Sequence, residues 1–210
     1  MRNNSMEIHK QIKFGNLSTS EKEIKDLIKA WIAISIAFAI AISIPSFSFY
    51  VNFVIASLTV GIGFLFHEMG HKVVAQRYGC FAEFRSFDNM LLVAIAMSFF
   101  GVIFAAPGAV MISGRINKTK NGKISAAGPI VNLILALIFF SLIFLQFPKH
   151  YRYIAYYGFL INSWLALFNM IPFWLFDGYK ILKWNKLVYG AIVSIAIIFM
   201  LLQNFIVLPK

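Results

Sequence analysis

The chain has 210 residues, of which 60% are hydrophobic and only 13% are charged, and its formal net charge is +11. This composition excludes an ordinary soluble domain, in which about a quarter of the residues are charged. The apolar residues occur in long blocks, so the positive charge is better explained by the basic flanks of membrane segments than by nucleic-acid binding.

The apolar residues form six blocks along the chain. A helix that spans a bilayer needs roughly 20 mostly apolar residues, and most of the blocks reach that length. We therefore expect an all-α polytopic protein of the cell membrane, folded as a single membrane-embedded domain over residues 1–210 with about six apolar segments. The blocks are residues 30–44, 51–74, 91–112, 124–147, 153–175 and 187–208.

The first 26 residues are polar and mixed in charge, and we expect them to form a cytoplasmic tail. Ser20 followed by Glu23 resembles a capping box, which predicts that a helix begins near Ser20 and continues into the first apolar block. Cys80 is the only cysteine, so an intrachain disulfide is excluded.

The second block contains the sequence FLFHEMGHKVV, in which His67 and His71 are four residues apart. On a helix this spacing puts both imidazoles on one face, where they can bind one Zn²⁺. Glu68 lies beside the first imidazole, and its carboxylate can accept a proton from water that the metal activates. Histidines that are only hydrogen-bonded are the alternative. Ionisable groups in an apolar helix are costly and rare unless functional, so the motif predicts one zinc ion per chain.

A catalytic zinc usually has a third protein ligand. Asp177 is favoured by elimination, because it follows an apolar block at a helix end that Pro172 and Gly178 interrupt. The alternative for Asp177 is a capping or loop residue just outside the bilayer. Three other candidates directly follow the motif helix and would have to reach back to the metal, namely Cys80, Glu83 and Asp88. The fourth, His150, belongs to a loop expected on the opposite side of the membrane.

The position of Asp177 constrains the topology. His67 and Asp177 both lie toward the C-terminal ends of their blocks, so these blocks must run in the same direction if both residues bind one metal. Two blocks lie between them, and one of the two therefore makes no net crossing. If every block crossed and the N-terminus were cytoplasmic, seven cations between positions 115 and 186 would lie outside. If residues 91–112 instead return to the side they entered from, these seven cations lie on the cytoplasmic side with the N-terminus and the active site. The positive-inside rule favours this second arrangement.

The sequence of this returning block suggests its structure. Pro107 and Gly108 provide a reversal point, and GAVMISG after them predicts a strand. We expect a helix up to about Ala106 and then a short membrane-embedded β element around residues 108–125. Irregular backbone at that depth is tolerated only where it is buried in protein or lines a watery cavity. The alternative is an ordinary sixth span.

Together these motifs resemble those of site-2 proteases, the intramembrane zinc metalloprotease family. The resemblance rests on HEMGH, AAGPIVN and NMIPFWLFDG, which follow the order and approximate spacing of the family and cover a catalytic core of residues 61–179. The chain departs from the family at Phe176, where Leu is common, and at Phe173–Trp174, where a second proline is frequent. The resemblance is to a minimal form without PDZ-like or nucleotide-sensing (CBS) domains.

The resemblance implies that the strand element belongs beside the active site. It also implies the roles of the site residues, which are zinc ligation by His67, His71 and Asp177, base catalysis by Glu68, and hydrogen bonding of the substrate or oxyanion by Asn169 with Asn132 as a companion.

The predicted function is zinc-dependent cleavage of transmembrane segments of membrane-protein substrates within the lipid bilayer. A peptidase of the glutamate-ligand type is one alternative, but its only downstream glutamate is the poorly placed Glu83. A metal transporter or zinc-sensing membrane protein is another, although a transport path needs polar residues along several spans. The sequence does not predict the identity of the substrate or the oligomeric state.

Overall fold

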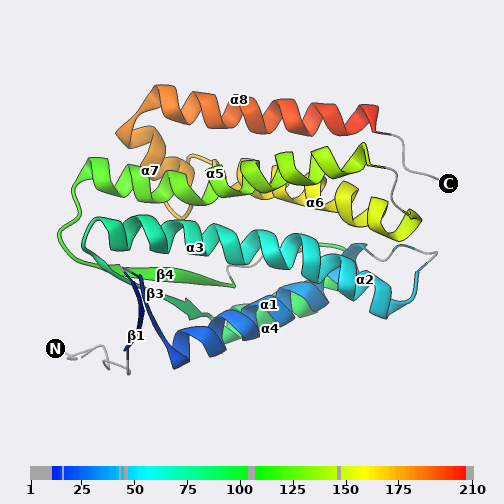
Figure 1. The fold of residues 1–210 in the computed structure, drawn as a ribbon, viewed down its shortest axis with the longest axis horizontal. Coiled ribbons are helices and arrows are strands. Elements are labelled where there is room, and N and C mark those ends of the chain that lie inside the picture. Colours follow the sequence, from blue (N-terminus) through cyan, green and yellow to red (C-terminus); the bar gives the residue numbers. More distant parts are fainter. Residues whose placement is uncertain are drawn as a thin grey trace.

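The structure is a computed structural model that describes residues 11–15, 17–42, 44, 47–103, 107–145 and 148–206 (Figure 1). It is mainly helical, with two small antiparallel sheets, β1–β2 and β3–β4. The elements in chain order are β1 (Gln11–Phe14), β2 (Leu17–Ser20), α1 (Glu21–Ile42), α2 (Phe49–Ala56), the π-helical turn η1 (Ser57–Gly61), α3 (Ile62–Arg77), β3 (Phe81–Ser86), α4 (Asp88–Ser98), β4 (Gly108–Ser113), α5 (Lys118–Ile143), α6 (Lys149–Asn169), α7 (Asp177–Trp184), α8 (Lys186–Leu202) and the 3₁₀ turn η2 (Gln203–Phe205).

Three continuous helical stretches of the described chain are long and apolar enough to cross a bilayer, namely Phe49–Arg77, Lys118–Ile143 and Lys186–Phe205. Large apolar side chains lie exposed on them, such as Leu137 of α5 and Ile198 of α8. Apolar surface of this extent needs a partner, and for helices of this length the bilayer is the natural one. The helices therefore indicate a membrane-associated protein, although they account for only part of the six predicted segments.

The predicted start of the first helix is confirmed. α1 begins at Glu21, and the Glu23 N–H donates to Ser20 Oγ at 3.2 Å. Upstream, residues 11–14 and 17–20 of the expected tail form the paired strands β1 and β2, while residues 1–10 lie outside the described part. The hairpin is held against α3, because the Gln76 side chain donates to the Ser18 carbonyl at 2.9 Å.

The apolar block at residues 91–112 does not form a spanning helix. α4 has 11 residues, a length of about 16 Å at 1.5 Å per residue, which is roughly half the hydrocarbon thickness of a bilayer. The chain turns near Gly101, whose φ is 72°, and returns as β4 antiparallel to β3 with Gly108 opposite Ser86. A segment that leaves after Ser86 and comes back beside it makes no net crossing, as the loop charges predicted.

The predicted end of this helix was wrong. α4 ends at Ser98 rather than near Ala106, and residues 104–106 lie outside the described part. Pro107 is also not the point of reversal. Its carbonyl accepts a hydrogen bond from the Phe87 N–H at 3.1 Å and so extends the ladder between β3 and β4.

The predicted β element around residues 108–125 was too long. β4 ends at Ser113, and α5 starts at Lys118 because the Asn117 side chain accepts from the Lys120 N–H at 2.8 Å. Such an N-cap satisfies one of the free amides at a helix start.

α5 is the central helix and contacts α3, α6 and α7. Figure 1 shows α3 and α6 running in the same direction and α5 in the opposite one, with the β3–β4 sheet beside α3. The C-terminal end of α3 and the junction of α6 with α7 thus lie at the same end of the bundle, as the topological argument requires.

The returning hairpin makes a testable prediction about sidedness. Arg77→Cys and Lys118→Cys, each made in a Cys80→Ala background, should react with a membrane-impermeant maleimide from the same side of the membrane, since the α4–β4 segment makes no net crossing. Leu145→Cys, beyond the other end of α5, is the control and should react from the opposite side. Labelling of positions 77 and 118 from opposite sides would contradict the topology.

Candidate metal centre

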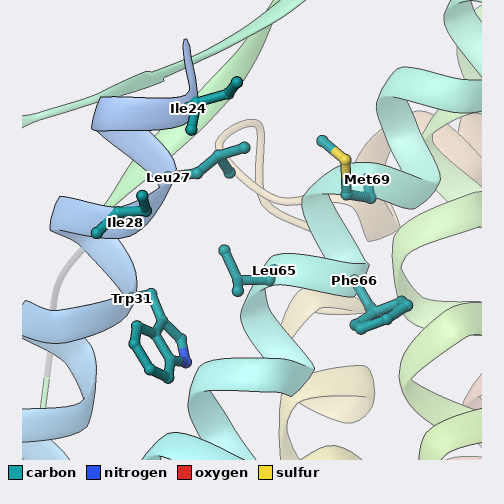
Figure 2. Close-up of a pocket in the computed structure, with 7 residues that line it drawn as sticks. All are labelled: Ile24, Leu27, Ile28, Trp31, Leu65, Phe66 and Met69. Atoms are coloured by element: carbon teal, nitrogen blue, oxygen red, sulfur yellow. The ribbon is translucent and has the colours of Figure 1, made fainter. Parts of the chain in front are cut away.

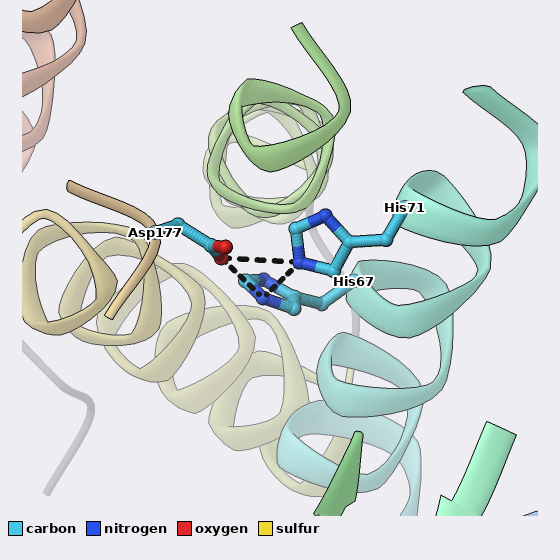
Figure 3. A group of neighbouring side chains, drawn as sticks. All are labelled: His67, His71 and Asp177. Atoms are coloured by element: carbon cyan, nitrogen blue, oxygen red, sulfur yellow. Dashed lines mark hydrogen bonds and ion pairs between the residues drawn. The ribbon is translucent and has the colours of Figure 1, made fainter. Parts of the chain in front are cut away.

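Three buried side chains converge between α3, α5 and α7 (Figure 3). His67 and His71 project from successive turns of α3, and Asp177 opens the first turn of α7. The two Nε2 atoms lie 3.0 Å apart, and Asp177 Oδ2 lies 3.4 Å from the Nε2 of His67 and 3.1 Å from that of His71. The structure thus brings together the three residues that the sequence selected as metal ligands.

The outer nitrogen of each imidazole is hydrogen-bonded to an oxygen. His67 Nδ1 lies 2.6 Å from Asn132 Oδ1, and His71 Nδ1 lies 2.8 Å from the Ile124 carbonyl. Because both partners are acceptors, each Nδ1 must carry a proton, which leaves Nε2 of each ring with a free lone pair. Two lone pairs and a carboxylate oxygen therefore face the same point.

This donor set fits zinc. A tetrahedral Zn²⁺ with bonds of about 2.0–2.1 Å holds its ligand atoms roughly 3.3 Å apart, close to the distances of 3.0, 3.1 and 3.4 Å among these three atoms. The carboxyl of an aspartate is normally ionised at neutral pH, and a carboxylate oxygen is a usual ligand of Zn²⁺ beside imidazole nitrogens. Asp177 is therefore an anionic donor.

Gly128 of α5 makes room for the cluster. A Cβ at this position would lie 2.5 Å from His71 Nε2 and 2.6 Å from His67 Nε2, inside the contact distance of any side chain. Only a glycine lets the backbone of α5 pass this close to the imidazoles, which explains why the Gly-Pro element lies opposite the two-histidine motif.

Asn132 belongs to a buried chain of amides. Its Nδ2 donates to the Gly63 carbonyl at 3.1 Å and to Asn162 Oδ1 at 3.0 Å, and Asn162 Nδ2 in turn donates to the Gly158 carbonyl at 2.9 Å. The chain ends on backbone carbonyls, so it fixes the orientation of both amides and directs Asn132 Oδ1 toward His67. Asn132 is fully buried and contacts the imidazole of the candidate ligand His67.

The sequence analysis missed Asn162. It lies seven residues before Asn169, or about two helical turns, on the same face of α6. A fully buried amide within an apolar segment is the signal that could have identified it, because such groups are retained only where they are hydrogen-bonded.

Glu68 points toward the sheet. Its side chain is buried, and its carboxylate lies close to the Val110 N–H of β4. Glu68 therefore has the two histidines of α3 on one side and the edge of β4 on the other.

Asn169 is the last residue of α6, and its side-chain amide donates to the Leu165 carbonyl of the same helix at 2.9 Å. Its role toward a substrate stays a prediction. Gly178 was expected to permit a turn, but its φ is not positive, and it is instead packed so closely that a Cβ would overlap the Met170 carbonyl at the end of α6.

The rejected ligand candidates have other partners. Glu83 pairs with Arg85 at 2.7 Å, and the Cys80 thiol is buried in an apolar cluster. Asp88 pairs with Lys29 at 2.5 Å, and this bond lowers the pKa of the Asp88 carboxyl. The side chain of His150 lies outside the described part.

The sequence is similar to those of proteins named as zinc metalloproteases, which is consistent with a zinc site. Over 182 residues the chain is 43% identical to a protein of Methanocaldococcus jannaschii named as a putative zinc metalloprotease, and the match covers 85% of this chain and 92% of the relative. This chain belongs to the same zinc metalloprotease family. A second protein of that organism, named as a zinc metalloprotease, is 28% identical over 128 residues, which are 58% of this chain and 31% of the relative. No family model and no solved structure matches.

The metalloprotease also has an apolar cavity of about 330 Å³ between α1 and α3 (Figure 2). On α3 its lining residues Leu65 and Met69 lie two positions from the metal-site histidines, or about 200° around the helix. The cavity is therefore separate from the candidate metal centre, and its lining offers no imidazole, carboxylate or thiolate for a zinc ion. It is lined by Ile24, Leu27, Ile28, Trp31, Leu65, Phe66 and Met69.

The close approach of α5 makes a testable prediction about metal content. Gly128→Ala should reduce the zinc bound by the purified metalloprotease from one ion per chain to well under half, because the added methyl overlaps both Nε2 atoms. Gly190→Ala on α8 is the matched control, since a Cβ there meets nothing within 4 Å, and it should retain its zinc. Full zinc content of Gly128→Ala by elemental analysis would contradict this account of the site.

Proposed function

We propose that this metalloprotease is an intramembrane endopeptidase of the site-2 type, which uses one zinc ion to cleave transmembrane segments of membrane-protein substrates. The observation that carries the proposal is the location of the donor cluster. His67, Glu68 and His71 all lie within Phe49–Arg77, a helical stretch apolar enough to span a bilayer. A hydrolytic site on such a helix is best suited to a peptide bond that is itself in the membrane.

The side chains have separate roles in this proposal. A zinc ion held by His67, His71 and Asp177 would polarise the scissile carbonyl and make water more acidic. The Glu68 carboxylate accepts the proton of the attacking water and returns it to the leaving amine. Asn169 hydrogen-bonds the substrate or the developing oxyanion. Its predicted companion Asn132 instead orients His67, because its Oδ1 is already bonded to that imidazole.

A substrate helix hides its amides in its own hydrogen bonds, so it must unwind locally before cleavage. β4 can bind the unwound segment, since the β3–β4 sheet has no third strand in the described part of the chain. The Phe84 N–H donates to Glu23 instead of crossing to its partner Val110. Phe84 and Val110 are therefore a non-hydrogen-bonded pair, and the backbone groups of Val110 point away from β3.

Because backbone direction alternates along a strand, Gly108 and Ile112 present their groups on the same open edge as Val110. Glu68 lies at this edge. A substrate strand added to β4 would gain main-chain hydrogen bonds and pass directly beside the proposed base.

Charge supports an orientation with the N-terminus and the active site on the cytoplasmic side of a multi-pass protein. The basic residues of the β4–α5 connection and of α7 belong to the same end of the bundle as the metal site. The positive-inside rule places such residues in the cytoplasm, where they would also contact anionic lipid.

Cleavage of a transmembrane peptide tests the proposed function. The purified full-length protein is reconstituted with a peptide whose roughly 20 apolar residues are interrupted by Asn-Gly. The wild type should cleave it, and a chelator should stop the reaction. Glu68→Gln should keep its zinc but lose about 10²–10⁴-fold in rate, the usual contribution of a general base. Asp177→Ala should lose zinc and activity together.

Glu21→Gln is the control for this series, because Glu21 is exposed on α1 and pairs with the exposed Lys25 at 2.6 Å, and it should cleave like the wild type. Equal cleavage by wild type, Glu68→Gln and Asp177→Ala would refute the proposal. Zinc uptake into vesicles that survives Glu68→Gln, without peptide cleavage, would instead favour a transporter.

A further inference from the structure

The outer edge of β3 is closed by side chains from two helices. The Phe84 N–H donates to Glu23 Oε1 of α1 at 2.9 Å, and the Ala82 carbonyl accepts from Gln76 Nε2 of α3 at 3.0 Å. These are the outward-pointing groups that a further strand would use. The sheet is therefore fixed to α1 and α3 along one edge, while no further strand pairs with the other edge in the described part of the chain.

Glu23 is the centre of this attachment. It is fully buried, and besides the Phe84 amide its carboxylate accepts from Thr19 Oγ1 at 2.7 Å and pairs with Lys72 Nζ at 2.5 Å. Lys72 is itself only 5% exposed. Two buried charges cost several kcal/mol to desolvate, so such a pair is weak evidence of a stabilising role and calls for another explanation.

The position of the Glu23–Lys72 pair suggests such an explanation. Lys72 directly follows the proposed ligand His71 on α3. Glu23 joins Lys72 to the Phe84 amide, Phe84 lies opposite Val110, and the Val110 N–H lies close to the Glu68 carboxylate. The contacts thus run from Lys72 of α3 through α1, β3 and β4 back to α3. The ion pair is one of the contacts that fix the position of β4 relative to α3.

We propose that Glu23 and Lys72 are positioning residues, which hold the open edge of β4 at the distance from the metal ligands that a bound substrate carbonyl requires. This rests on the proposed function. Among the described residues, the side chains of Glu23 and Lys72 make no hydrogen bond to a proposed metal ligand or to β4. Their effect falls on the reaction of the bound substrate, because displacement of a reacting group by about 1 Å can cost 10²-fold in rate.

The test must separate positioning from folding. Removal of one partner leaves the other charge buried and unpaired, which destabilises the protein whatever the role of the pair. Glu23→Gln/Lys72→Met removes both charges together, and the introduced amide retains an oxygen that can accept from the Phe84 N–H. The double variant thus removes the charged link from Glu23 to α3, while the contact of Gln76 with the Ala82 carbonyl remains. The exposed pair on the same helix gives the matched control, Glu21→Gln/Lys25→Met.

The full-length proteins are compared for zinc content, thermal unfolding, and kcat and KM on the Asn-Gly transmembrane peptide. In the double variant kcat should fall at least about tenfold while KM stays within about threefold, with zinc content and unfolding temperature unchanged. The control should match the wild type throughout. An unchanged kcat would overturn the proposal, and so would a parallel loss of zinc or of folding, since that is the result of a merely structural pair.

A second measurement stays informative if the wild type does not cleave the peptide, a result that would count against the proposed function and not against this pair. Amide hydrogen exchange in residues 81–86 and 108–113 should accelerate at least about tenfold in the double variant, because the sheet loses its attachment to α3 through Glu23 and Lys72, while exchange in residues 62–77 stays the same. Unchanged exchange in both strands would overturn the proposal.

Discussion

Two imidazole lone pairs and a carboxylate oxygen point at one buried location, and the rest of the structure depends on this convergence. Without a cation the three donors would repel one another, because the outer nitrogen of each ring already donates to an oxygen. Neighbouring elements are arranged to preserve the geometry. Gly128 lets α5 pass beside the rings, and a chain of two buried asparagines sets the orientation of His67.

The same convergence dictates the topology. His71 and Asp177 come from two helical segments that meet at one end of the bundle, so α3 and α6 run in parallel and the chain between them cannot cross every time. The α4–β4 segment resolves this parity by turning back beside β3. Its return also brings a strand edge to Glu68. One topological solution thus brings the candidate metal ligands together and provides the edge proposed to bind the substrate.

Several of these features could be predicted from residues alone, because they depend on local spacing or on charge. The two-histidine motif requires only a helix, the return of residues 91–112 follows from loop cations, and the start of α1 follows from a capping box. Long-range side-chain contacts could not be predicted. Gln76 holds part of the expected tail against α3 as a hairpin. Gln76 and Glu23 also both bind β3, a strand that the polar sequence after the motif did not predict. The pairing of Asn132 with His67 likewise depends on how α3 packs on α5.

Zinc K-edge X-ray absorption on the purified full-length protein tests the central claim most directly. We expect one zinc per chain, bound by two imidazole nitrogens and carboxylate oxygen at about 2.0–2.1 Å. Asp177→Ala should lose the metal or its carboxylate ligand. A protein that binds no zinc, a sulfur ligand from Cys80, or a coordination shell unchanged by Asp177→Ala would contradict the account.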